Sequence, residues 1–130
     1  MRRMKRSLGY AVAGMTHAFE REKNLRMFLY GLIVVVALGF YVRLIGWEWL
    51  TLILAGGAFV IAELLNTAIE RFVDVVDHQR RSDSGGFHAN LKAAKDVAAA
   101  ASLAALIVNI AVICIVFWPY ALMGVKALMK

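Results

Sequence analysis

Five polar side chains recur at helical spacing in the middle of the chain, separated by three, four, four and three residues: Glu63, Asn66, Glu70, Asp74 and Asp77. A helix through this stretch would place all five on one stripe. The fourteen residues before the stripe, 49–62, carry no charge and are mostly apolar. Carboxylates at membrane depth are costly unless they are paired, protonated or bound to a cation, so a row of them is typical of a functional site.

Two further charged groups, Glu22 and the neighbours Lys95 and Asp96, are expected at the same membrane boundary and suggest the chemistry. Carboxylates without histidine or cysteine partners suit hard cations, above all Mg²⁺, which is usually held by one or two carboxylates together with substrate phosphates. Lys95 can neutralise a phosphate, and Glu63, the deepest carboxylate, can accept a proton from an alcohol whose tail lies in the lipid. The pattern predicts phosphoryl transfer from a nucleotide to a lipid.

The elements that must position these groups are membrane-spanning helices. The chain has 130 residues, of which 62% are hydrophobic, and its mean hydropathy is +0.68. The 29 residues from Val97 to Val125 carry no charge, which is more than the roughly 20 needed to cross a bilayer core. We predict an all-α membrane protein of one domain, 1–130, with an amphipathic N-terminal surface helix at about 5–25 and three transmembrane helices at about 27–47, 49–76 and 95–120. Since only neighbouring helices can shield a polar face, we also expect a homo-oligomer.

The distribution of positive charge predicts the orientation in the membrane. Seven of the 15 Lys and Arg residues lie at or before Arg26, and five lie between Arg71 and Lys95. By the positive-inside rule, the N-terminus and the segment 71–95 are cytoplasmic and the C-terminus is outside. Within that segment, 78–87 is predicted to be a loop because it contains SDSGG. No nucleic-acid partner is expected, because the basic residues flank the spans and form no separate domain.

Each feature also has a simpler interpretation. The stripe could be an interhelical polar face, Glu22 part of a charged interfacial segment, and Lys95 a membrane anchor with Asp96 as its ion partner. An oligomeric cation or proton conductor would also use acidic residues, but these acids crowd one end of a span and 49–62 offers no polar relay. A membrane scaffold would leave the polar face unexplained. Ser102 lies seven residues after Lys95 on the same stripe, so we expect it to hydrogen-bond to a neighbouring helix.

Four segments carry a resemblance to a known family: GYAVAG (9–14), EKNLR (22–26), ELLNTAIERFVD (63–74) and AAKD (93–96). They are similar to the prokaryotic diacylglycerol kinase and undecaprenol kinase family of small integral membrane lipid kinases. The run E-x-x-N-[ST]-A-I-E-x-x-x-D followed by A-K-D is highly specific, because no general rule for helices or membranes would produce it. EKNLR and the sequence before the stripe look more like the undecaprenol kinase branch. The segment 78–87 looks longer than is usual in the family.

The resemblance implies a role for each matching residue. Glu63 matches the catalytic base, with Asn66 beside it, and Glu22 and Glu70 match the two carboxylates that hold Mg²⁺ with ATP. The residues that match nucleotide contacts are Arg3, Tyr10, Glu22, Glu70, Asp74, His88, Lys95 and Asp96. The family implies a homotrimer with active sites between subunits, in the bacterial plasma (inner) membrane. The expected reaction transfers the ATP γ-phosphate to undecaprenol, giving undecaprenyl phosphate, or to diacylglycerol, giving phosphatidate, with undecaprenol slightly favoured.

Overall fold

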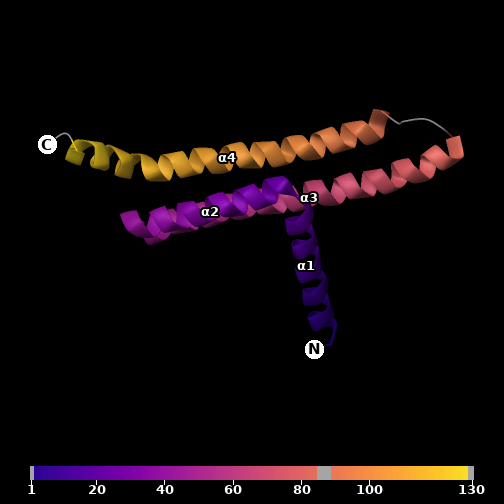
Figure 1. Cartoon of the computed structure of the whole chain (residues 1–130), viewed down its shortest axis with the longest axis horizontal. Helices are drawn as coiled ribbons and strands as arrows, with labels where there is room; N and C mark the ends of the chain where they lie inside the picture. Colours follow the sequence, from indigo (N-terminus) through magenta and orange to yellow (C-terminus); the bar gives the residue numbers. More distant parts are fainter. Residues whose placement is uncertain (1, 85–88, 129–130) are drawn as a thin grey trace.

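The computed structural model describes residues 2–84 and 89–128, and this part of the chain is helical throughout except at two short connections. The helices are α1 (Arg2–Arg21), α2 (Lys23–Val42), α3 (Gly46–Ser84) and α4 (Ala89–Leu128). Helices α2, α3 and α4 run lengthwise beside one another, whereas α1 stands across them (Figure 1). The predicted all-α fold is therefore confirmed.

Three of these helices are long and apolar enough to cross a membrane: Lys23–Val42, Gly46–Gln79 and Asn90–Lys126. Many of their large apolar side chains are exposed, including Phe40, Ile53 and Ile115. Exposed apolar surface on this scale suits contact with lipid rather than with water. The three predicted spans are thus present as candidate membrane helices, while the amphipathic surface helix and the oligomer stay predictions.

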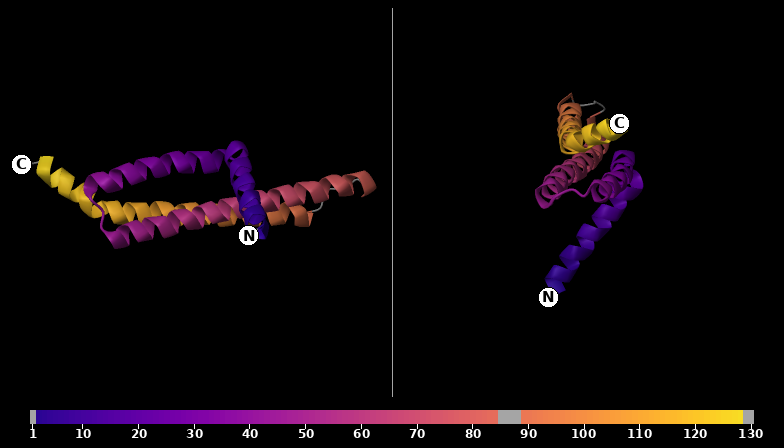
Figure 2. Two further views of the ribbon diagram at one scale, coloured as in Figure 1. Left: turned by 90° about the horizontal axis from the view of Figure 1, so that it is seen from below. Right: turned by 90° about the vertical axis from the view of Figure 1, so that its left-hand side faces the viewer.

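The corner between α1 and α2 is a single residue, Glu22, whose extended backbone (φ −94°, ψ 110°) separates the two helices. Arg26 stabilises this corner from the first turn of α2, because its Nη1 donates to the carbonyl oxygens of Phe19 (3.0 Å) and Glu20 (2.7 Å). These carbonyls lie in the last turn of α1, where a helix has no backbone donors left for them. As a result α1 points away from the three lengthwise helices, as the right-hand view of Figure 2 shows.

The turn between α2 and α3 occupies residues 43–45. Arg43 adopts the left-handed conformation (φ 60°, ψ 53°), and the Leu44 N–H donates to the Gly39 carbonyl over 3.0 Å. The buried Glu48 accepts a hydrogen bond of 2.8 Å from the Ile45 N–H, which caps the start of α3. Because of this cap, α3 begins at Gly46, slightly before the predicted start at about 49.

Helices α3 and α4, of 39 and 40 residues, form the long axis of the molecule. Near the α2–α3 turn they enclose a small core of Leu44, Leu52 and Val116.

At the opposite end α3 continues to Ser84, so the predicted loop 78–87 is wrong for residues 78–84, where regular helix overrides the local turn signal. Pro119 lies inside α4, and the helix bends in its final part (Figure 2), as is expected where proline removes a backbone hydrogen bond.

Candidate functional site

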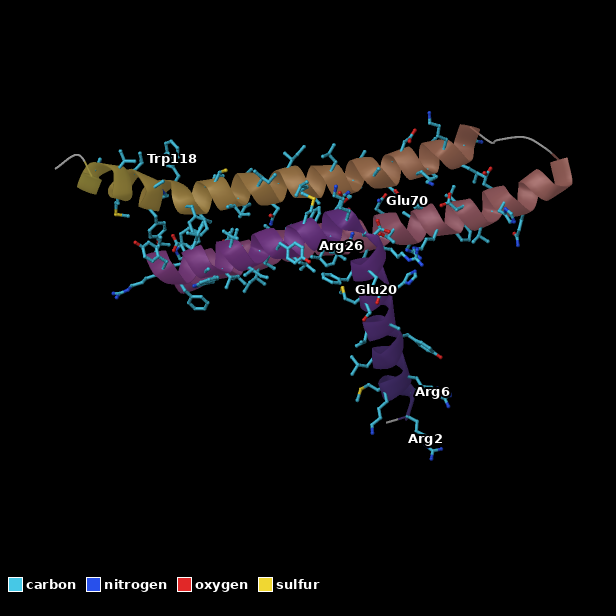
Figure 3. The ribbon with its side chains drawn as sticks, in the orientation of Figure 1. Arg2, Arg6, Glu20, Arg26, Glu70 and Trp118 are labelled. Carbon is cyan, nitrogen blue, oxygen red and sulfur yellow. The ribbon has the colours of Figure 1, made fainter. Side chains whose placement is uncertain are left out.

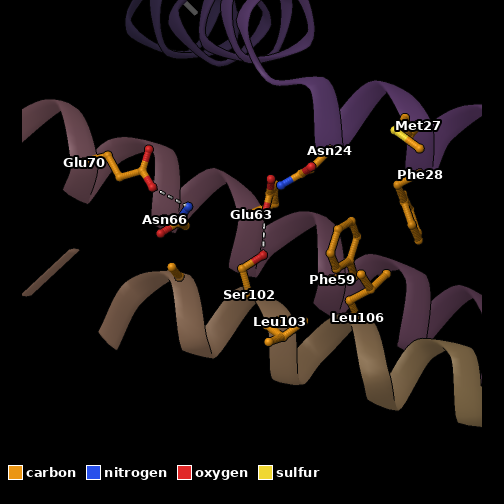
Figure 4. Close-up of a pocket in the computed structure, with 11 residues that line it drawn as sticks. Asn24, Met27, Phe28, Phe59, Glu63, Asn66, Glu70, Ser102, Leu103 and Leu106 are labelled. Atoms are coloured by element: carbon orange, nitrogen blue, oxygen red, sulfur yellow. Dashed lines mark hydrogen bonds between the residues drawn. The ribbon is translucent and has the colours of Figure 1, made fainter. Parts of the chain in front are cut away.

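The principal cavity of the described chain has a volume of about 580 Å³ and lies where the beginning of α2 faces the middle of α3 and the first half of α4. One part of its lining is polar, with side chains from all three helices: Asn24, Glu63, Asn66, Glu70 and Ser102. The other part is apolar and includes Phe28, Phe59 and Leu106 (Figure 4). Phe28 and Phe59 pack against each other with ring centroids 4.4 Å apart. A single cavity thus offers both a polar and a hydrocarbon surface.

Glu63 is the most buried acidic side chain described, at 3% exposure. The hydroxyl of Ser102, on α4, donates a short hydrogen bond to its Oε2. The amide of Asn24, on α2, points toward the same carboxylate (Figure 4). Thr67 contacts the main chain of Glu63 instead, donating from Oγ1 to the carbonyl oxygen over 3.0 Å. The carboxylate is therefore approached by polar groups from both neighbouring helices.

Asn66 and Glu70 follow Glu63 along α3 and line the same cavity. Asn66 Nδ2 donates to Glu70 Oε1 over 3.1 Å. The other atom of that amide, Oδ1, is buried and has no hydrogen-bond partner among the described residues. A buried acceptor without a donor is unusual in a folded protein and is often explained by an ion, water or ligand that binds there.

A second cavity, of about 330 Å³, lies farther along α3 beside the first turns of α4. Its charged lining residues are Asp74, Asp77, Lys92, Lys95 and Asp96. The structure brings together Lys95 and Asp74, whose Nζ and Oδ1 atoms are 2.9 Å apart. The predicted juxtaposition of the stripe with the start of the last span is confirmed by this ion pair.

The side chain of Glu22 lies beside α3, where its ion partner is Arg71. Its Oε1 is 3.8 Å from Nη2 of Arg71, the residue that follows Glu70. Arg71 also forms a short hydrogen bond with Nε2 of His17, on α1. Figure 3 shows Glu70 on α3 close to the α1–α2 corner. The corner thus brings Glu22 near the stripe, although Glu22 does not line the principal cavity.

These donors can be tested for their fit to Mg²⁺. Within residues 2–84 and 89–128 there is no cluster of three or more His, Cys, Asp or Glu side chains that could hold a metal ion without other ligands. Mg²⁺ bound with a nucleotide does not need such a cluster, because the phosphates supply several of its oxygen ligands. Glu70, Glu22 and the unpartnered Asn66 Oδ1 are hard oxygen donors of the kind it prefers. The residues fit a metal–nucleotide complex better than a free ion.

The two predicted nucleotide residues on α1, Arg3 and Tyr10, do not line either cavity. Arg3 and Tyr10 belong to α1 and are exposed, Tyr10 at 77%. The start of α1, marked by Arg2 and Arg6 in Figure 3, extends far from the principal cavity. His88 lies outside the described residues. In the described chain, therefore, α1 brings none of its predicted contacts to the site, and these assignments stay predictions.

Two polar residues of the principal cavity, Asn24 and Ser102, have no site role predicted from the sequence. The expectation that Ser102 hydrogen-bonds to a neighbouring helix is confirmed, and its partner is the principal acid of the stripe. Seven-residue spacing from Lys95 was a signal for Ser102, since it placed both on one stripe. For Asn24 the only signal was its position in the EKNLR segment, and this position does not indicate that the side chain faces α3.

Comparison with known proteins relates this chain to one family. A family model for prokaryotic diacylglycerol kinase matches residues 9–117, which include both cavities. The chain is 30% identical to the undecaprenol kinase of Bacillus subtilis (strain 168), covering 92% of this chain and 91% of that protein. It is 34% identical to the diacylglycerol kinase of Synechocystis sp., covering 82% of this chain and 57% of that protein. It is also 32% identical to the diacylglycerol kinase of Helicobacter pylori, covering 82% and 77%.

Proposed function

This chain belongs to the prokaryotic diacylglycerol kinase family, and we propose that it transfers the γ-phosphoryl group of ATP to the hydroxyl of a membrane lipid, with undecaprenol as the favoured acceptor. It is a lipid kinase of the membrane, as its family and its three apolar helices indicate. The nucleotide, the metal, the acceptor and the role of each residue are parts of the proposal.

The observation that carries the proposal is the position of the Glu63 carboxylate at the junction of polar and apolar linings in one cavity. A lipid alcohol is itself polar at one end and apolar along its tail, so such a junction suits its hydroxyl. Glu63 then accepts the proton that the hydroxyl loses as its oxygen attacks the γ-phosphorus and ADP departs. Phe28, Phe59 and Leu106 offer the tail an apolar surface.

The depth of Glu63 supports the same role. It lies seventeen residues after Gly46, the first residue of α3, or about 26 Å along the helix. A bilayer core is about 30 Å thick, so a helix that enters at its start brings Glu63 to the opposite edge. Lipid hydroxyls and soluble nucleotides can meet only at such an edge. The carboxylate is therefore within reach of both substrates.

The nucleotide is assigned to the polar side of Glu63. Lys95 and Asp96 would lie against the phosphates, with Asp74 orienting Lys95 through their 2.9 Å contact. Glu70 and Glu22 would hold Mg²⁺ together with the phosphates, with Asn66 beside Glu63. When bound, the ion would neutralise negative charge on the transferring phosphoryl group. Arg3, Tyr10 and His88 complete the proposed nucleotide contacts.

The lipid acceptor and the oligomeric state are proposed from sequence similarity and from the exposure of α1. Undecaprenol is favoured because the Bacillus subtilis undecaprenol kinase aligns over nearly all of both chains, and because EKNLR resembles that branch. Diacylglycerol is the second candidate, since relatives of similar identity carry that name. We further propose a homotrimer in the bacterial plasma membrane with a cytoplasmic N-terminus. The exposed position of Tyr10 supports a site completed by a second subunit.

The direct test is Mg²⁺-dependent transfer of labelled phosphate from ATP to undecaprenol and to diacylglycerol, assayed side by side with purified protein in detergent. Glu63→Gln keeps the shape of the side chain but removes the proton acceptor, so it should abolish transfer while leaving the oligomer folded. Faster transfer to undecaprenol would support the favoured acceptor, and faster transfer to diacylglycerol would replace it. Transfer to neither lipid by folded protein would overturn the proposed reaction.

A further inference from the structure

The contact between Ser102 and Glu63 joins two helices through side chains that are both almost completely buried. Ser102 is 5% exposed and Glu63 is 3% exposed, and they lie 39 residues apart in the chain. Figure 4 shows the hydroxyl of Ser102 directed from α4 toward the carboxylate on α3. Neither side chain lies on a loop or at the surface, so the packing of α3 against α4 sets the geometry of the contact.

The direction of this hydrogen bond is informative. A serine within a helix commonly donates to the backbone carbonyl four residues earlier, as Thr67 does toward Glu63. Ser102 could satisfy its hydroxyl in the same way against Ala98, yet it donates across the interface to Oε2 of Glu63. A hydroxyl has a single proton to donate, so this donation commits Ser102 to the carboxylate.

The hydrogen bond from Ser102 also affects the other carboxylate oxygen of Glu63, Oε1. Oε2 accepts from Ser102, whereas no hydrogen bond to Oε1 is formed within the described residues. A hydrogen bond to a carboxylate is stronger than one between neutral groups and restricts the rotation of the side chain. Restricting Oε2 also fixes where Oε1 points within the cavity that both residues line.

We propose that Ser102 is a positioning residue for the acceptor step, which fixes the Glu63 carboxylate so that Oε1 faces the lipid hydroxyl. The proposal rests on the proposed function, in which Glu63 accepts the proton. Ser102 does not itself touch the reacting atoms and contributes nothing to the binding of ATP or of the lipid. Orientation of a proton acceptor affects the rate of the chemical step more than the affinity for substrates.

The test compares three variants of the full-length protein in detergent, using ATP and whichever lipid the wild type phosphorylates. Ser102→Ala removes the donor and should lower kcat by about tenfold, with both KM values changed less than about twofold. Ser102→Thr keeps a hydroxyl and should restore kcat to within about threefold of the wild type. Thr67→Val is the matched control, because it removes a buried hydroxyl that contacts only the Glu63 main chain, and it should stay near wild type.

The outcomes separate this proposal from the proposed function. If Glu63→Gln is inactive but Ser102→Ala has wild-type kcat, the positioning role is overturned and the role of Glu63 stands. A higher lipid KM at unchanged kcat would instead make Ser102 a lipid contact, which also overturns it. Equal losses in Ser102→Ala and Thr67→Val would reveal a general packing effect. Activity in Glu63→Gln would overturn the underlying function itself.

Discussion

Lys95 and Asp74 form an ion pair between α4 and α3, with 2.9 Å between Nζ and Oδ1. Both side chains are accessible, at 36% and 65% exposure. An exposed pair of this kind contributes little to stability, about 0–1 kcal/mol. The ion pair instead positions the cationic group of Lys95 in the lining of the cavity that also includes Asp96.

Lys95→Met should therefore impair nucleotide binding without unfolding the protein. Loss of one charge-assisted phosphate contact is expected to raise the KM for ATP by about tenfold to a hundredfold. Steady-state kinetics at varied ATP would measure this, with Lys126→Met as a control that removes a cation near the other end of α4. An unchanged KM for ATP in Lys95→Met would remove Lys95 from the proposed nucleotide site.

The proposed metal carboxylates can be tested through the Mg²⁺ requirement. Glu70→Ala and Glu22→Ala should each raise the Mg²⁺ concentration for half-maximal activity by about tenfold or more, because each removes a hard oxygen ligand. Glu20→Ala provides a control, since Glu20 accepts the hydrogen bond from Arg26 through its backbone carbonyl, which the substitution keeps. If Glu22→Ala leaves the Mg²⁺ requirement unchanged, the pairing of Glu22 with Arg71 is structural only.

Tyr120 should stabilise the end of the molecule near the α2–α3 turn. Its hydroxyl donates to Oε2 of the buried Glu48 over 2.8 Å, so Tyr120→Phe leaves that carboxylate with one donor fewer. The expected result is a lower free energy of unfolding than that of the wild type, measured by denaturant titration in mixed micelles. Tyr41→Phe removes the hydroxyl of a side chain that is 84% exposed and should have no effect. Equal stabilities of the two variants would contradict the assigned role.

Gly39 should tolerate no larger residue. A Cβ at this position would lie 2.6 Å from Cη2 of Trp49, whose ring also packs against Phe40 with centroids 4.9 Å apart. Gly39→Ala should therefore destabilise the protein by about 1–3 kcal/mol through overpacking. Gly57→Ala is the matched control, because a Cβ there meets nothing within 4 Å. An equal loss of stability in both variants would contradict overpacking against Trp49 as the cause.

The main elements of this fold could be predicted from the sequence because long apolar runs determine membrane helices and a stripe of acids determines one face of α3. The α2–α3 boundary could not, since it depends on the left-handed backbone of Arg43 and on the cap from Glu48. The helical extension to Ser84 was missed because SDSGG is a strong local turn signal.

The candidate site was predicted on α3 more completely than on its neighbours. Periodicity identifies the facing side of a helix only when polar and apolar residues alternate, and the 29 uncharged residues of α4 offer little contrast. The rotation of α4 is instead decided by packing against α3, which turns Ser102 toward Glu63. Asn24 was overlooked for a similar reason, because the Glu22 corner sets the direction of α2.

The turn at residues 43–45 has a further consequence. It is followed by a continuous helix that carries Glu63 seventeen residues beyond Gly46. The helix cannot stretch, so the distance between the turn and Glu63 is fixed, whatever the hydrophobic thickness of the surrounding lipid. If the membrane is thicker or thinner than this distance, the membrane must deform or the helix must tilt. Under the proposed function, the acyl-chain length of the surrounding lipids thus becomes a determinant of how closely the lipid hydroxyl approaches Glu63.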